Sequence, residues 1–331
     1  MTEQVAQENS ETGLIHAFLM NGKGGGRLLS WEELQDWTPD QGKIWMHFDY
    51  TVAATRSWLE SNSGLDQIII DALLTEDTRP RTTNIEDGLL ITLRGVNNNP
   101  GADPEDMVSI RMWAEADRII STRKRKLLSV KDLLRQLERG KGPKDMAEFI
   151  VYLTDRLVWR MIDTVDQLEE KIDDIEDKAL TENPGDLRHD LSELRRQTIA
   201  LRRYLSPERD ALTKIMVEQV SWIQDIHRRK MREVGERLIQ HIEDIDVVRE
   251  RTSVMNEQLL SRLSEQLNQR MYVLSILSAI FLPLGFLTGL LGVNLGGIPG
   301  AQGSSAFWLF VGLLFLVVLS QLAMLRWKKW L

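Results

Sequence analysis

A small group of polar atoms follows a long apolar run near the end of the chain. Gly292, Val293 and Asn294 come directly after Met271–Leu291, a run without a charged side chain. Asn294 side chains repeated around an axis would offer amide oxygens to the water shell of a divalent cation, beside the backbone carbonyls of the triplet. A bare zinc ion prefers nitrogen or sulfur ligands, and the run contains no His, Cys, Asp or Glu. The side chains of this region therefore suit a hydrated cation better than a bare zinc ion.

Six residues at helical spacing extend from this triplet, the candidate mouth of a conduit, along one side of the apolar run. The predicted conduit lining consists of Asn268, Met271, Ser275, Ser278, Leu282 and Gly285. The two serines have an equally good alternative role, because small residues are common where helices pack in lipid. Met271 and Leu282 could narrow the conduit or simply belong to a core.

Two apolar runs must hold these residues in a bilayer. Met271–Leu291 and Ala306–Leu325 each reach the length of about 20 residues that a spanning helix needs. Residues 292–305 between them carry no ionisable side chain, which predicts a hairpin whose loop lies outside the cell. The positive-inside rule then places both termini, including the tail 326–331, in the cytoplasm, because the flanking basic residues lie outside the pair: Arg262, Arg270, Arg326, Lys328 and Lys329.

A long helix is predicted to lead into the first span. No proline occurs between Trp222 and Pro283, and an apolar stripe recurs at close to 3.6 residues, at Val234, Leu238, Ile242, Ile245, Val248, Met255, Leu259, Leu263, Leu267, Met271 and Leu274. At about 1.5 Å per residue, the predicted stalk (221–270) and the first span (271–291) together are on the order of 100 Å long. Such a helix cannot bury its stripe alone, so helices of the same or other subunits must cover it.

The placement of Gly292-Val293-Asn294 resembles the CorA-type family of divalent metal-ion transporters, whose signature is a Gly-x-Asn triplet ending the first of two C-terminal spans. The resemblance covers nearly the whole chain. The loop that follows, Gly296–Gly300, lacks the acidic residue of the magnesium and cobalt transporters and is similar to the zinc-transport (ZntB) branch. The triplet alone is a weak signal, because Gly95-Val96-Asn97 repeats it in a polar loop.

The resemblance implies a homopentamer with the stalk around its pore. It also implies zinc transport across the bacterial inner membrane, with no bound cofactor, and leaves the driving force open among the metal gradient, the membrane potential and proton coupling. A magnesium or cobalt channel of the same family is one alternative, and a membrane-anchored scaffold or sensor is another. An enzyme ranks last, since no Walker loop or nucleophile–base pair is present. The net charge of −8 disfavours a nucleic-acid partner.

An α+β cytoplasmic domain is predicted for residues 1–140. The polar start of the chain shows no secretory signal, and the chain has no cysteine. Apolar, β-branched runs predict strands at 14–20, 44–50, 88–93, 107–113 and 118–122, and helices are expected at 52–61 and 66–74. The glycines of 21–27 (NGKGGGR) indicate a hairpin turn more than a phosphate loop, because no Gly-Lys-Ser/Thr ending follows.

Residues 141–220 read as a helical region. One helix is predicted over 146–179 and a second, antiparallel one over 186–205. Seven carboxylates between Asp166 and Asp177 could concentrate cations, although a solvated acidic face is the commoner explanation. The five histidines show no His-x3-His spacing and are interpreted as structural or surface residues. His241, near Glu243, Asp244 and Asp246, is the best candidate for a cytoplasmic metal site.

Overall fold

The computed structural model describes residues 12–76, 79–179, 184–292 and 305–328, together with residues 181 and 303. The chain divides into two compact units, Met1–Asn256 and Glu257–Leu331. Helix α9 (Asp225–Gly292) contributes residues to both units.

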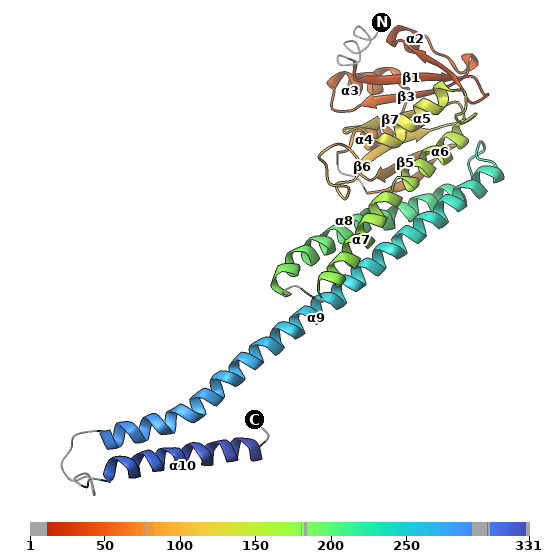
Figure 1. Ribbon diagram of the computed structural model, residues 1–331. Helices are drawn as coiled ribbons and strands as arrows, with labels where there is room; N and C mark the ends of the chain where they lie inside the picture. The colour runs from red at the N-terminus through yellow and green to blue at the C-terminus, as the bar shows by residue number, and fades with distance from the viewer. Residues whose placement is uncertain are drawn as a thin grey trace. The chain divides into compact units, whose positions relative to one another are not determined.

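The described part of the first unit contains a seven-stranded sheet in the order β2-β1-β3-β7-β6-β5-β4 (Figure 1). β3 and β7 run parallel, and the other described pairs are antiparallel. The strands are β1 (Leu14–Met20), β2 (Gly26–Leu29), β3 (Lys43–Asp49), β4 (Arg81–Ile85), β5 (Gly88–Gly95), β6 (Val108–Ala114) and β7 (Arg118–Arg123). All five predicted strands are confirmed, with ends that differ by no more than two residues.

Two strands were not predicted, because neither contains an apolar run long enough to indicate a strand. β2 has four residues, and β4 reads Arg-Thr-Thr-Asn-Ile. The glycine-rich stretch before β2 is the predicted hairpin turn, closed by a 2.8 Å hydrogen bond from the Asn21 N–H to the Gly25 carbonyl.

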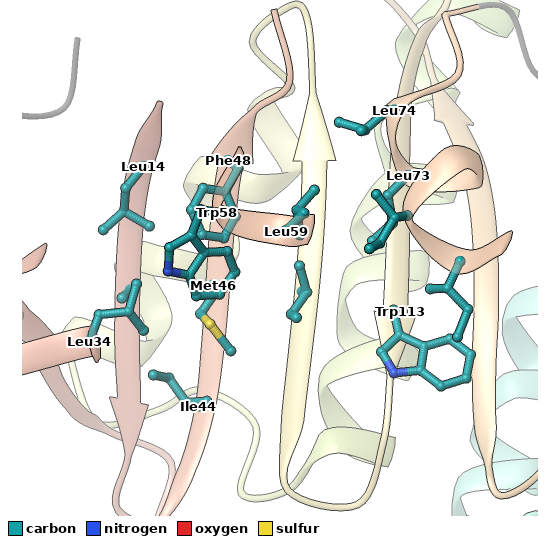
Figure 2. Packing of buried hydrophobic residues seen from close by; sticks show 14 of the residues in the cluster. Leu14, Leu34, Ile44, Met46, Phe48, Trp58, Leu59, Leu73, Leu74 and Trp113 are labelled. Carbon is teal, nitrogen blue, oxygen red and sulfur yellow. The ribbon is translucent and has the colours of Figure 1, made fainter. Parts of the chain in front are cut away.

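Short helices cover both faces of the sheet. On one face, Met46 and Phe48 of β3 pack with Trp58 and Leu59, as Figure 2 shows. On the other face, the Trp45 ring of the same strand meets Phe149 at 4.8 Å between ring centroids. The helices are α2 (Trp31–Gln35), the 3-10 turn η1 (Pro39–Gln41), α3 (Ala53–Asn62), α4 (Gln67–Leu74), α5 (Leu128–Glu138) and α6 (Met146–Trp159).

The prediction of one helix over 146–179 is wrong, because α6 ends at Trp159 and α7 runs from Ile162 to Lys178. The chain tightens between them, and the Met161 N–H bonds to the Val158 carbonyl three residues back. α8 (Pro184–Val217) continues twelve residues beyond the predicted end at Leu205 and passes through Pro207. The predicted pairing of an acidic helix with a basic one is confirmed by packing between α7 and α8.

The part of α9 in the first unit buries its apolar stripe. Met231, Val234, Leu238, Ile242 and Val248 are all less than 6% exposed. Ion pairs join this part of α9 to its neighbours: Arg202 of α8 meets Asp246 at 3.0 Å, and Arg251 meets Asp173 and Glu176 of α7 at 2.6 Å.

The second unit contains the rest of α9 and α10 (Ala306–Trp327). Both helices are long and apolar enough to cross a membrane. They lie side by side (Figure 1), and the Gln321 amide of α10 donates a 3.2 Å hydrogen bond to the Ala279 carbonyl of α9. The predicted pair of apolar helices is therefore present.

Candidate ion-conduction site

α10 covers one side of the apolar part of α9. The half-buried α9 residues there are Ile276, Ile280, Pro283, Leu284 and Leu287. An α-helix turns by about 100° per residue, so these five positions share one face. The six predicted conduit residues lie on roughly the opposite face. All six are exposed, including Met271 at 62% and Leu282 at 74%. Within this chain, α10 thus leaves the predicted conduit face open.

Gly285 stands at the edge of that face. It also borders an apolar groove of about 540 Å³ lined by Phe281, Leu284, Thr288, Val311, Leu314, Phe315 and Val318. The prediction that Gly285 lines a conduit is therefore weaker than the same prediction for Ser275 or Leu282, which do not border this groove.

Two hydroxyls in the span donate to their own helix. Ser275 Oγ donates to the Met271 carbonyl at 2.8 Å, and Thr288 Oγ1 donates to the Leu284 carbonyl at 2.9 Å. A hydroxyl whose proton is used this way still offers lone pairs. Ser275 can accept hydrogen bonds from the water shell of a cation, because the water molecules around a cation point their hydrogens outward.

The mouth triplet extends past the part of the chain that the structure describes. Gly292 is the last residue of α9, whereas Val293 and Asn294 lie outside the described residues. Recognition of a hydrated ion at this triplet stays a prediction.

The second copy of the triplet has a structural role. Gly95 ends β5, and Asn97 is 3% exposed. The Asn97 side-chain oxygen accepts a 2.7 Å hydrogen bond from the Asn99 amide, and the Asn97 N–H bonds to the Pro104 carbonyl at 3.2 Å. This copy folds a loop of the first unit.

The acidic stretch of α7 faces α9 in part. Arg251 pairs with Asp173 and Glu176, so these two carboxylates hold helices together. Burial, followed by the charges of Asp244, Asp166 and Asp173, raises the pKa of Glu169. Asp173 and Glu176 of the acidic stretch are therefore paired with Arg251, whereas Glu169 is surrounded by other carboxylates.

The cytoplasmic metal-site candidate at His241 gains no support. Asp246 pairs with Arg202, so its carboxylate is already engaged. Among the residues that the structure describes, no group of three His, Cys, Asp or Glu side chains could hold a metal ion.

The fold combines an α/β domain with two helices, α9 and α10, that are long and apolar enough to cross a membrane. The model of the family described as CorA-like Mg2+ transporter protein matches residues 40–327, and the chain belongs to this family.

Relatives are similar over the full length. The chain is 40% identical to the divalent cation transporter CmaX of Pseudomonas aeruginosa, across 99% of this chain and 100% of the relative. It is 38% identical to the zinc transport protein ZntB of Pectobacterium carotovorum, across 100% of both. The solved structure of full-length CmaX superimposes with a TM-score of 0.84 at 39% identity, covering 97% of this chain and 99% of that one.

Proposed function

We propose that the protein transports divalent metal ions across the bacterial inner membrane, with zinc as the main cargo. The observation that carries this proposal is full-length similarity to relatives named for zinc and for divalent-cation transport, at 38% and 40% identity. The relatives are transporters by name, and the proposal includes no catalytic step.

The pore is built from several copies of the chain. A single copy leaves the conduit face of α9 exposed, and that face combines Ser275 and Ser278 with large apolar side chains. Packing copies around an axis would cover the apolar atoms and turn the hydroxyl oxygens toward a shared channel. Five copies follow from the family resemblance.

The ion passes through the span with much of its water. Met271–Leu291 contains no His, Cys, Asp or Glu, so it lacks the ligands that a dehydrated zinc ion needs. Asn294 supplies amide oxygens to the water shell at the outer mouth, beside the carbonyls of Gly292 and Val293. A magnesium or cobalt cargo remains the alternative, because water-shell recognition separates hydrated dications weakly.

The orientation puts both termini in the cytoplasm. The flanks of the hairpin carry Arg270 and Arg326, and the loop between the spans has no ionisable side chain. A cysteine placed at Ser304 should react with an impermeant thiol reagent in intact spheroplasts, and tags at either terminus should be protected.

The deciding experiment is ion flux into liposomes that contain the purified protein. Zinc, magnesium, cobalt and nickel are compared with and without a pH gradient. We expect zinc uptake above that of protein-free liposomes, and faster uptake under a pH gradient would add proton coupling. Magnesium flux without zinc flux would assign the alternative cargo, and no flux of any ion would contradict the transporter proposal.

A further inference from the structure

A β-bulge places two histidines side by side on the sheet. β1 and β3 pair with Leu14 opposite Phe48 and, after a register shift, with His16 opposite His47. Residues two apart in a regular strand share a face, so His16 would normally follow Leu14. The extra residue, Ile15, instead turns His16 to the face that carries His47. The two imidazole ring centroids lie 5.1 Å apart.

Hydrogen bonds around Ser121 fix the proton on His47. The Trp45 indole donates to Ser121 Oγ at 2.8 Å, and Ser121 Oγ donates to the Met46 carbonyl at 3.2 Å. His47 Nδ1 lies 2.8 Å from the same Oγ. The hydroxyl has one proton, so all three contacts are satisfied only when His47 Nδ1–H is a donor. The Nε2 atom of neutral His47 then carries a bare lone pair.

Both Nε2 atoms are buried, and neither has a hydrogen-bond partner among the described residues. A buried acceptor without a partner costs free energy, so a water molecule or an ion is needed to satisfy it. A histidine whose Nδ1–H is held by a neighbouring oxygen and whose Nε2 is bare has the arrangement typical of metal-binding histidines.

The surroundings keep both imidazoles neutral. Burial, together with the charge of Arg123, lowers the pKa of His16 to about 3. Burial, followed by the charges of His16 and Arg123, holds the pKa of His47 well below its usual range. The positive charge of Arg123 opposes a bound cation, and the nearby Asp49 carboxylate offsets part of it.

We propose that His16 and His47 bind one metal ion between their Nε2 atoms, and that the ion is a d10 ion with an affinity for imidazole, Zn2+ or Cu+. Metal–nitrogen bonds of about 2.0–2.1 Å hold the centres of two imidazoles on the order of 5 Å apart. Magnesium and calcium do not fit, because they take oxygen ligands. A centroid separation of 5.1 Å requires a bent nitrogen–metal–nitrogen angle. Zn2+ would meet this angle in a tetrahedral site completed with water, and Cu+ would have to leave its preferred linear arrangement and add a further ligand such as water. This site goes beyond the proposed transport function and uses none of the conduit residues.

The test counts ions on the full-length protein in detergent. Zn2+ and, in a separate anaerobic arm with a reductant, Cu+ are added to wild type, His16→Ala and His47→Asn. The asparagine amide can still donate to Ser121 but offers no Nε2. His189→Asn changes an exposed histidine of α8 and serves as the matched control. We expect each site variant to bind one ion per chain fewer than wild type, in the arm whose metal the site prefers. The control should bind the wild-type number.

Two further measurements keep the test decisive. X-ray absorption should show two imidazole ligands on an ion that is present in wild type and missing from the variants. Circular dichroism and thermal unfolding without metal check that each variant folds. If His47→Asn does not fold, the ion count of His16→Ala decides the test. Equal ion counts in wild type and a folded variant, in both arms, would overturn the proposal and leave a water molecule between the histidines.

Discussion

One helix, α9, shows the same apolar periodicity in two regions with opposite outcomes. In the first unit the stripe is covered by the same chain, and Leu238 is fully buried. In the second unit Leu267, Met271 and Leu274 continue the stripe and are each about 60% exposed. The periodicity shows that a helix needs partners and does not say which chain supplies them. α9 thus holds its own domain together in one region and is available to other copies in the other.

The largest expected effect comes from the mouth beyond the second region. Asn294→Leu should lower ion flux in liposomes by at least about tenfold, since the loss of roughly 1.4 kcal/mol of ion recognition is enough for that. Oligomer size should not change. Asn97→Leu alters the second copy of the triplet and should leave flux near wild type if the protein folds. Near-normal flux in Asn294→Leu would make the mouth triplet a structural turn.

The same substitution in the two regions of α9 should affect different properties. Leu238→Ala opens a cavity in a packed interior and should cost about 2–5 kcal/mol in the free energy of unfolding. Leu282→Ala removes an exposed side chain and should leave unfolding of the first unit unchanged, while weakening the oligomer in mild detergent. Chemical denaturation and light scattering separate the two results. A monomeric wild type would remove the shared pore.

A pH effect should belong to the first unit. Burial raises the pKa of Glu208 to about 8. The hydrogen bond from the Arg94 backbone N–H and the positive charge of Arg94 lower this pKa but do not outweigh burial. The pKa of a glutamate in the unfolded chain is about 4.3. Between this pH and about 8, the folded chain therefore keeps a proton that the unfolded chain has lost. Stability should therefore fall as pH rises from about 4.3 to about 8 and level off above. Glu208→Gln should flatten this slope in denaturant titrations. An unchanged slope would assign the dependence to other groups.

The smallest effect concerns the ion pairs that hold α9 to α7. Arg251 is one-third exposed and pairs with two carboxylates. Arg251→Gln should cost about 0.5–1 kcal/mol in unfolding free energy, and less at high salt, because solvent and ions screen the pairs. Equal losses at low and high salt would point to packing by the arginine stem.

The sequence predicted those parts of the fold that have local signals. Strands such as β3 and β6 show in their apolar and β-branched residues, and the spans show in the lack of charge. β4 was missed because polar side chains hold it in place: Thr82 donates to the Ala211 carbonyl of α8, and the Asn84 amide donates to Glu218, the residue after α8. Such contacts join residues more than a hundred positions apart and have no local pattern.

The candidate sites divide in the same way. Helical spacing predicted which α9 residues share a face, and the structure adds that α10 covers the opposite face. Spacing could not find His16 and His47, because a cross-strand pair depends on register and, here, on a bulge. Their separation along the chain matches no helical metal motif, so the sequence alone indicates structural or surface histidines.

The strand order also has a consequence for folding kinetics. β2-β1-β3 and β7-β6-β5-β4 are two groups of sequence-local antiparallel strands, joined by the parallel pair β3–β7. Closing that pair brings together segments about seventy residues apart, which costs more loop entropy than closing a hairpin. During synthesis on a ribosome, β3 emerges well before β7. Until β7 is available, the edge of β3 that faces away from β1 remains unpaired. We therefore expect Ser121→Ala, which removes bonds across this seam, to slow refolding in stopped-flow experiments more than it speeds unfolding.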